Sequence, residues 1–122
     1  MLKWLHQKLS KRAHIQLEDW SVQLVQDKLS INDGLGTTST VEIAAIQKVV
    51  IQTDDSGPWG PDFLYFLFAD RSEPVGVFPL EAQGAADFVA WLERQPGFNS
   101  QQFGQAAGST NVAQFVVFQA QL

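Results

Sequence analysis

Six short strand patterns follow one another between residues 20 and 78, and no helical pattern separates them. This succession restricts the fold more than any other feature of the sequence. Apolar and β-branched residues alternate with polar ones, and clusters of Asp, Gly and Pro lie between the segments. The expected strands are 22–24, 29–31, 37–43, 47–53, 63–69 and 75–78. Six successive strands without a crossover helix predict an antiparallel sheet or barrel.

Turn and loop signals separate these strands. The apolar residues change parity across Gln26-Asp27-Lys28, which predicts a tight turn between two antiparallel strands. Asp33-Gly34 is a second turn signal, because both residue types tolerate a positive φ. Residues 54–62 contain two glycines and two prolines and therefore predict a loop. The apolar run 63–69 that follows predicts a central strand covered on both faces.

An amphipathic helix is expected at about residues 82–95, because apolar residues recur there at the spacing of one helical face. The residues on that face are Ala85, Phe88, Val89 and Leu92. Pro96-Gly97 ends this helix. Asn99, with Gln102 three residues later, has the pattern of an N-cap and predicts a second, short helix.

A last strand pattern lies at 113–119. Six or seven antiparallel strands with a helix able to close the open end of a bent sheet resemble the pleckstrin-homology-like (PH-like) fold. We therefore expect an α+β fold, either an antiparallel barrel or a bent sheet of six to seven strands. A C-terminal capping helix, a second short helix and a short N-terminal amphipathic helix complete this expectation.

Two motifs resemble a group of small uncharacterised bacterial proteins. In that group a Thr-x-Asp-x-Gly-Pro-x-x-Pro-Asp loop precedes an aromatic strand, and a helix ends in Leu-Pro-Gly-Phe-Asp or a similar sequence. Residues 51–66 and 91–99 match these motifs, with Gln95 in place of the usual leucine and Asn99 in place of the usual aspartate. The resemblance covers about residues 20–118. It implies a fold and no activity.

Composition restricts the possible functions. The 122 residues hold thirteen acidic and eight basic residues, a net charge of −5 and no cysteine. This length predicts one domain, residues 1–122. Without cysteine the chain has no thiolate nucleophile and no Cys-ligated metal. Its acidic body would repel a phosphate backbone, so no nucleic-acid partner is expected.

Residues 1–14 form a basic arm with a charge of +4, whereas the rest of the chain carries −9. On a helix, three leucines spaced i, i+3, i+7 share one face: Leu2, Leu5 and Leu9. The favoured interpretation is that this face docks against the domain. The alternative is attachment to a membrane surface or another anionic partner, with Trp4 as an interfacial anchor. The cations that would make this contact are Lys3, Lys8, Lys11 and Arg12. The arm has no continuous apolar signal sequence, so a cytoplasmic location is expected.

The 54–62 loop holds the other candidate site. Its three aspartates would serve as paired carboxylates or as oxygen ligands for calcium or magnesium, although their spacing matches no known metal loop. We favour the alternative that they cap turns. Trp59 would be either an exposed anchor for a partner or a lid over the core. The candidate binding residues are Asp54, Asp55, Gly57, Pro58, Trp59 and Asp62. No catalytic residue, metal or cofactor is expected.

Three functional hypotheses follow from these patterns. The leading one is a non-enzymatic interaction module that binds a protein partner. The acidic charge favours a basic partner, and immunity proteins that neutralise a basic toxin are a special case. The second is a peripheral membrane module that uses the basic arm. The third is a metal-dependent enzyme built on the 54–62 carboxylates. An enzyme is not expected, because both histidines lie in the arm and no base accompanies the serines.

Overall fold

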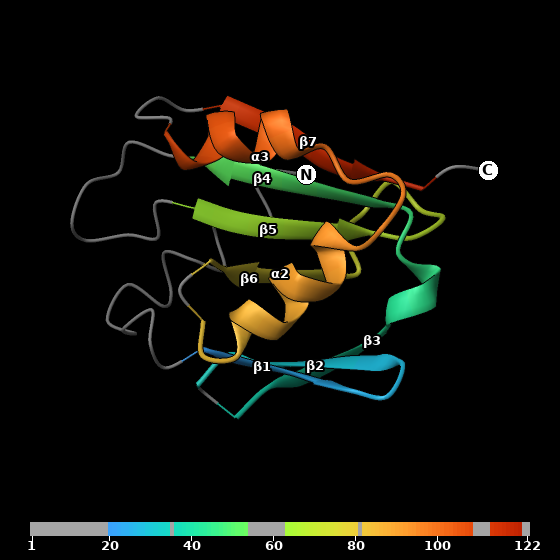
Figure 1. Cartoon of the computed structure of the whole chain (residues 1–122). Coiled ribbons are helices and arrows are strands. Elements are labelled where there is room, and N and C mark those ends of the chain that lie inside the picture. Colours follow the sequence, from blue (N-terminus) through green and yellow to red (C-terminus); the bar gives the residue numbers. More distant parts are fainter. Residues whose placement is uncertain (1–19, 35, 54–62, 81, 109–112, 121–122) are drawn as a thin grey trace.

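The computed structural model describes residues 20–34, 36–53, 63–80, 82–108 and 113–120 (Figure 1). Its elements are β1 (Ser21–Val25), β2 (Lys28–Asn32), β3 (Thr38–Glu42), the 3-10 turn η2 (Ile43–Ala45), β4 (Lys48–Thr53), β5 (Phe63–Phe68), β6 (Gly76–Pro79), α2 (Ala85–Glu93), α3 (Ser100–Ala107) and β7 (Ala113–Gln119). The fold is α+β, as the sequence predicts. The helix expected in residues 1–14 lies outside the described residues.

Strands β1, β2 and β3 form a three-stranded antiparallel sheet in that order. The tight turn predicted between the first two strands is confirmed, because Val25 pairs with Lys28 across Gln26 and Asp27. The turn predicted at Asp33-Gly34 is also present, and its backbone is held by the Thr37 amide, which donates to the Asp33 carboxylate at 3.2 Å. One face of this sheet is apolar and buried through Val22, Leu29, Ile31 and Val41.

Gln26 has a φ of 58°, and among the described residues it is the one non-glycine residue in the left-handed region. A side chain there costs roughly 1–2 kcal/mol. We expect Gln26→Gly to raise the free energy of unfolding by about 0.5–1 kcal/mol in a urea titration, because relief of this cost exceeds the added flexibility of the unfolded chain. Asp27→Gly is the control and should lower the free energy of unfolding, because Asp27 has no positive φ and therefore no strain that glycine could relieve. An equal response of the two variants would contradict the prediction.

The second sheet has four antiparallel strands in the order β6-β5-β4-β7. The last strand of the chain therefore pairs with β4 at one edge of this sheet. The register of β4 with β7 shifts between Val49 and Val50, where Val117 is an extra residue on β7. A bulge of this kind allows two successive side chains to face the same way. Both Val117 and Phe118 are buried, with 0% and 5% exposure.

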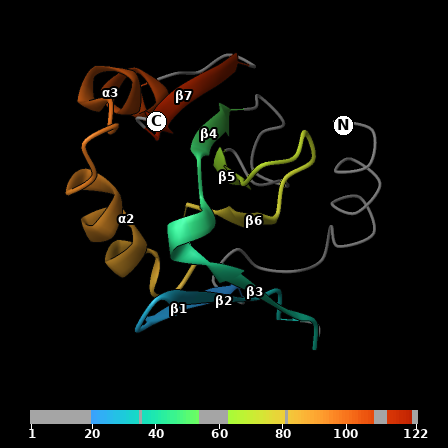
Figure 2. The same cartoon turned by 90° about the vertical axis from the view of Figure 1, so that its right-hand side faces the viewer.

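The main core lies between the two sheets and under the helices (Figure 2). At its centre Phe88 of α2 packs against Tyr65 and Phe78, and both ring-centroid distances are 5.3 Å. The sheets approach each other closely at Gly76. A Cβ there would lie 2.9 Å from the Ile31 Cδ1 and 3.2 Å from the Val41 Cγ2. The core residues thus come from both sheets and from α2.

The closed antiparallel barrel, one of the two forms expected from the sequence, is not formed by the described residues. Closure requires an unbroken ladder of hydrogen bonds around the sheet. Here η2 takes the chain from β3 into the other sheet, and β6 meets β2 and β3 by close packing around Gly76. At the opposite edge, β1 forms an isolated bridge between Ser21 and Gln83. Two separate sheets result.

The helix expected from residue 82 begins later, at Ala85. Gly84 precedes it with a φ of 84°, and Gln83 is used as a pairing residue of β1, since the Val22 amide donates to its carbonyl at 2.7 Å. A helical conformation of residues 82–84 would remove this contact. The N-cap prediction for the next helix is confirmed, because the Asn99 side chain accepts a 3.0 Å bond from the Gln102 amide.

Tyr65 is the single tyrosine of the chain and is 1% exposed. Burial, with a smaller contribution from the Glu93 carboxylate, raises the pKa of its phenol well above the usual value of about 10. Because the folded protein holds the proton more tightly, stability is full below about pH 10. It should fall by up to about 1.4 kcal/mol per pH unit above that value. Absorbance at 295 nm should therefore show no tyrosinate in the folded protein at pH 10.5, and ionisation near pH 10 in urea. Similar titration curves in both states would contradict the prediction.

Candidate binding face

The four-stranded sheet has a second face, which points away from the main core. Strand alternation turns one set of side chains of β4 and β5 inward and the other set outward. The cross-strand register aligns Val116 with Val50, Val50 with Phe66, and Phe66 with Val77. One residue from each strand thus forms a continuous apolar row across the sheet. We call the side of the sheet that carries this row the outer face.

The apolar residues of the outer face form a cluster separate from the main core. Val50, Leu64, Phe66 and Phe68 are only 8, 5, 3 and 6% exposed, and Val77 is packed against them. Figure 2 shows both helices on the other side of this sheet. In the described part of the chain, no helix or strand packs over this cluster. Val116, at the end of the row, is 40% exposed.

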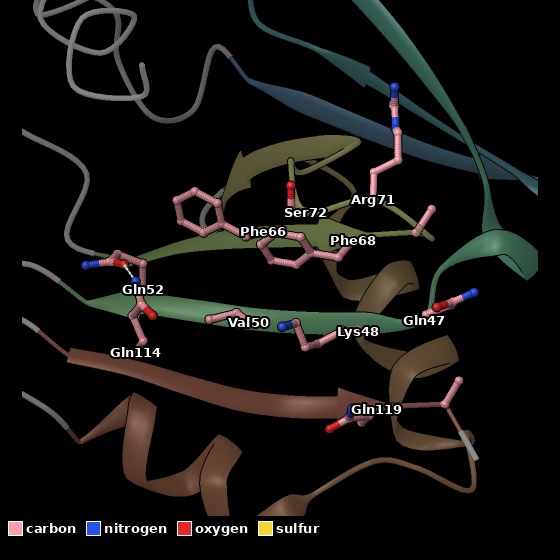
Figure 3. Close-up of a pocket in the computed structure, with 12 residues that line it drawn as sticks. Gln47, Lys48, Val50, Gln52, Phe66, Phe68, Arg71, Ser72, Gln114 and Gln119 are labelled. Carbon is pink, nitrogen blue, oxygen red and sulfur yellow. Dashed lines mark hydrogen bonds between the residues drawn. The ribbon is translucent and has the colours of Figure 1, made fainter. Parts of the chain in front are cut away.

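A pocket of about 380 Å³ opens on the outer face (Figure 3). Its apolar floor includes Val50, Phe66 and Phe68. Polar side chains surround this floor, and they belong to Gln47, Lys48, Gln52, Arg71, Ser72, Gln114 and Gln119. Among the described residues that line the pocket, none is acidic or a histidine.

The two ends of the pocket differ. At one end the Gln114 Nε2 donates to the Gln52 Oε1 at 2.8 Å, which joins β7 to β4 (Figure 3). At the other end the Lys48 Nζ lies 4.9 Å from the centroid of the Phe68 ring, a cation–π contact. Arg71 extends from the turn after β5. The pocket therefore combines an apolar floor with amide donors and acceptors and two cations.

The candidate residues named from the sequence lie outside the described residues. These are the loop residues Asp54, Asp55, Gly57, Pro58, Trp59 and Asp62, and the arm residues Lys3, Trp4, Lys8, Lys11 and Arg12. The membrane and metal hypotheses built on them stay predictions. The loop follows Thr53 and precedes Phe63. These two residues pair across β4 and β5, next to the pair formed by Gln52 and Leu64. The described residues that flank the loop, Thr53 and Phe63, are thus next in sequence to Gln52 and Leu64 of the outer face.

Sequence reasoning missed the residues of the outer face. A signal for them exists in β4, where Lys48, Val50 and Gln52 alternate with the buried Val49, Ile51 and Thr53. Such alternation indicates a strand with two different faces. Nothing in the sequence indicates that β7 pairs beside β4, so the Gln52–Gln114 contact and the apolar row could not be found.

No protein-family model matches the chain, and comparisons with curated proteins and with solved structures found no significant match. None of the described helices is long and apolar enough to cross a membrane. Within the described ranges, no group of three or more His, Asp or Glu side chains is placed to hold a metal ion.

Proposed function

We propose that this protein is a non-enzymatic interaction module that binds a protein partner through the outer face of its four-stranded sheet. The observation that carries the proposal is the apolar row from Val77 to Val116, whose central residues form part of the floor of a pocket surrounded by polar side chains. Protein interfaces commonly combine an apolar centre with a polar rim. The pocket and Val116, which is 40% exposed, are accessible parts of this face, and exposed apolar patches with polar residues around them are typical of interaction sites.

The charge of the protein favours a basic partner. The net charge of −5 gives a negative long-range potential that accelerates encounters with cations. At the Phe68 end of the pocket the Lys48 Nζ lies over the aromatic ring, and Arg71 also lines the pocket. A basic segment would therefore place its apolar side chains on the row and its cations away from that end. A toxin neutralised by an acidic immunity protein is one partner of this chemistry.

For the fold, we propose a PH-like arrangement. Six strands precede α2, which covers the core between two antiparallel sheets, as the resemblance implies. β7 follows both helices and adds a strand beside β4, which extends the four-stranded sheet.

Capture from a bacterial lysate at low and moderate salt tests the proposed function. The intact chain is compared with Val116→Glu, which adds a charge to the apolar row. Val25→Glu is the matched control, because Val25 and Val116 are both exposed, at 51% and 40%, but lie on different sheets. We expect a specific partner that is lost in Val116→Glu, retained in Val25→Glu and weakened by salt.

A third variant, Trp59→Ala with Asp54→Asn, separates the outer face from the 54–62 loop. Loss of the partner in this variant alone would assign binding to the loop and contradict the proposal for the outer face. Equal capture by Val116→Glu and the intact chain would contradict it as well. Thermal melts of all variants establish that each is folded.

A further inference from the structure

We propose that the basic arm, residues 1–14, docks as an amphipathic helix on the apolar row of the outer face of its own chain. The docking itself does not depend on the proposed partner. If the arm docks there, it occupies the surface that a basic partner would use. This consequence for binding rests on the proposed function. The experiment below therefore uses no partner.

The first argument is the apolar content of the outer face. Val50, Leu64 and Phe66 are at most 8% exposed, yet the described helices and the three-stranded sheet contribute their buried side chains to the other core. Removing a large apolar side chain from water stabilises a protein by roughly 1.5–3 kcal/mol. A face of this kind is stable when another apolar surface covers it. The apolar run of β5 is typical of a strand covered on both faces, so its outer side also needs an apolar surface over it.

The second argument is length. The row crosses four strands, or three strand spacings, about 14 Å. A helix of ten residues is about 15 Å long, and Leu2 and Leu9 would lie about 10 Å apart along it. The leucine face of the arm thus matches the row from Val77 to Val116. Two other segments do not fit as a helix over the row. Residues 109–112 are too few to span the row as a helix, and the 54–62 loop contains two prolines that exclude a helix of this length.

The third argument is charge. The arm carries four cations and no acid, and the rest of the chain carries a net −9. A helix with its leucines on the row would place its lysines on the opposite side, in solvent, where the negative net charge of the rest of the chain attracts them. Covalent attachment raises the effective concentration of the arm at the face to the millimolar range.

The two cations of the pocket restrict where the arm lies. Lys48 and Arg71 would repel the arm at the Phe68 end. The row through Phe66 contains no charge along its four positions. We therefore place the arm across this row, with the Lys48 end of the pocket left open beside it.

Cysteine crosslinking tests the docking directly, because the chain has no cysteine of its own. Leu5→Cys is combined in the full chain with Val77→Cys or with Val116→Cys, the two ends of the row. The matched control combines it with Ala90→Cys, an exposed position on α2 across the sheet. Each pair is treated with a short bismaleimide, and the rate of intramolecular crosslinking is measured by gel mobility. We expect at least one outer-face pair to react ten-fold faster than the control pair.

Comparable rates for all pairs, or a faster reaction with Ala90→Cys, would overturn the proposal. A crosslink that forms only between chains would also overturn it, and would indicate exchange of arms in a dimer. The proposal would also be overturned if no face-specific crosslink formed and the arm bound membranes instead. In that case the intact chain would sediment with phosphatidylglycerol vesicles, and a chain lacking residues 1–14 would not.

A second measurement does not depend on the introduced cysteines. Leu5→Asp with Leu9→Asp should lower the midpoint of thermal unfolding by about 5 °C or more, and should increase the binding of an apolar dye to the exposed face. Lys3→Gln with Lys11→Gln, on the polar side of the arm, is the control and should shift the midpoint far less. An unchanged midpoint and dye binding in the leucine variant would contradict docking, whatever the lysate experiment shows.

Discussion

Gly97→Ala is expected to destabilise the protein by at least about 3 kcal/mol. A Cβ at this position would overlap the backbone carbonyl of Gln119, which cannot move without disturbing β7. Two backbone hydrogen bonds hold the segment around Gly97 against β7. The Asn99 amide donates to the Val117 carbonyl at 2.8 Å, and the Gln119 amide donates to the Gly97 carbonyl at 3.2 Å. A steric overlap here therefore disrupts both of these backbone hydrogen bonds together.

Gly104→Ala is the matched control for this substitution. Gly104 lies inside α3, and a Cβ there would have no heavy atom within 4 Å. Alanine is the better helix former, so the free energy of unfolding should rise by about 0.5–1 kcal/mol. Urea unfolding followed by circular dichroism measures both variants. A loss of less than 1 kcal/mol for Gly97→Ala would contradict the close approach to β7.

Phe88→Ala should cost about 3–5 kcal/mol, because it leaves a cavity at the centre of the main core. Phe88 is 0% exposed, and its ring centroid lies 5.3 Å from those of Tyr65 and Phe78 and 5.7 Å from that of Trp91. Its substitution therefore removes contacts with both α2 and the four-stranded sheet.

Phe103→Ala provides the comparison for Phe88→Ala. Phe103 of α3 is half-buried and pairs with Phe98 at 5.6 Å, at the margin of the core. We expect its substitution to cost less than half as much in the same urea titration. Equal losses for the two variants would show that the core is not centred on Phe88.

Much of the local structure follows from sequence patterns. Parity of the apolar residues places the turn between Val25 and Lys28, since a change of parity exchanges the buried and exposed faces. Helical spacing identifies Phe88 and Leu92 as buried, and both are 0% exposed. The side chain of Asn99 caps α3 as its residue type and position predict. These features depend on neighbouring residues in the chain.

Local sequence patterns do not predict which distant strands pair. The bond between Gln114 and Gln52 joins residues 62 positions apart. Gly84 and Gly97 read as ordinary helix-boundary residues, but each is required because another strand's backbone lies against it, at Val22 and Gln119. The late start of α2 has the same origin.

The candidate site shows the same limit. The sequence draws attention to loops and charges, such as the 54–62 loop and the arm. The outer face instead emerges from alternate residues of four strands, each of them unremarkable alone. Val116, Val50, Phe66 and Val77 become one surface only because β7 pairs with β4 and β6 with β5.

The affinity of the outer face for the captured partner tests the central claim most directly. Isothermal titration calorimetry with the purified partner compares the intact chain, Val116→Glu and Val25→Glu at one salt concentration. If the outer face is the binding surface, Val116→Glu should raise the Kd at least ten-fold, about 1.4 kcal/mol, whereas Val25→Glu should change it less than two-fold. Equal Kd values for Val116→Glu and the intact chain would contradict the claim.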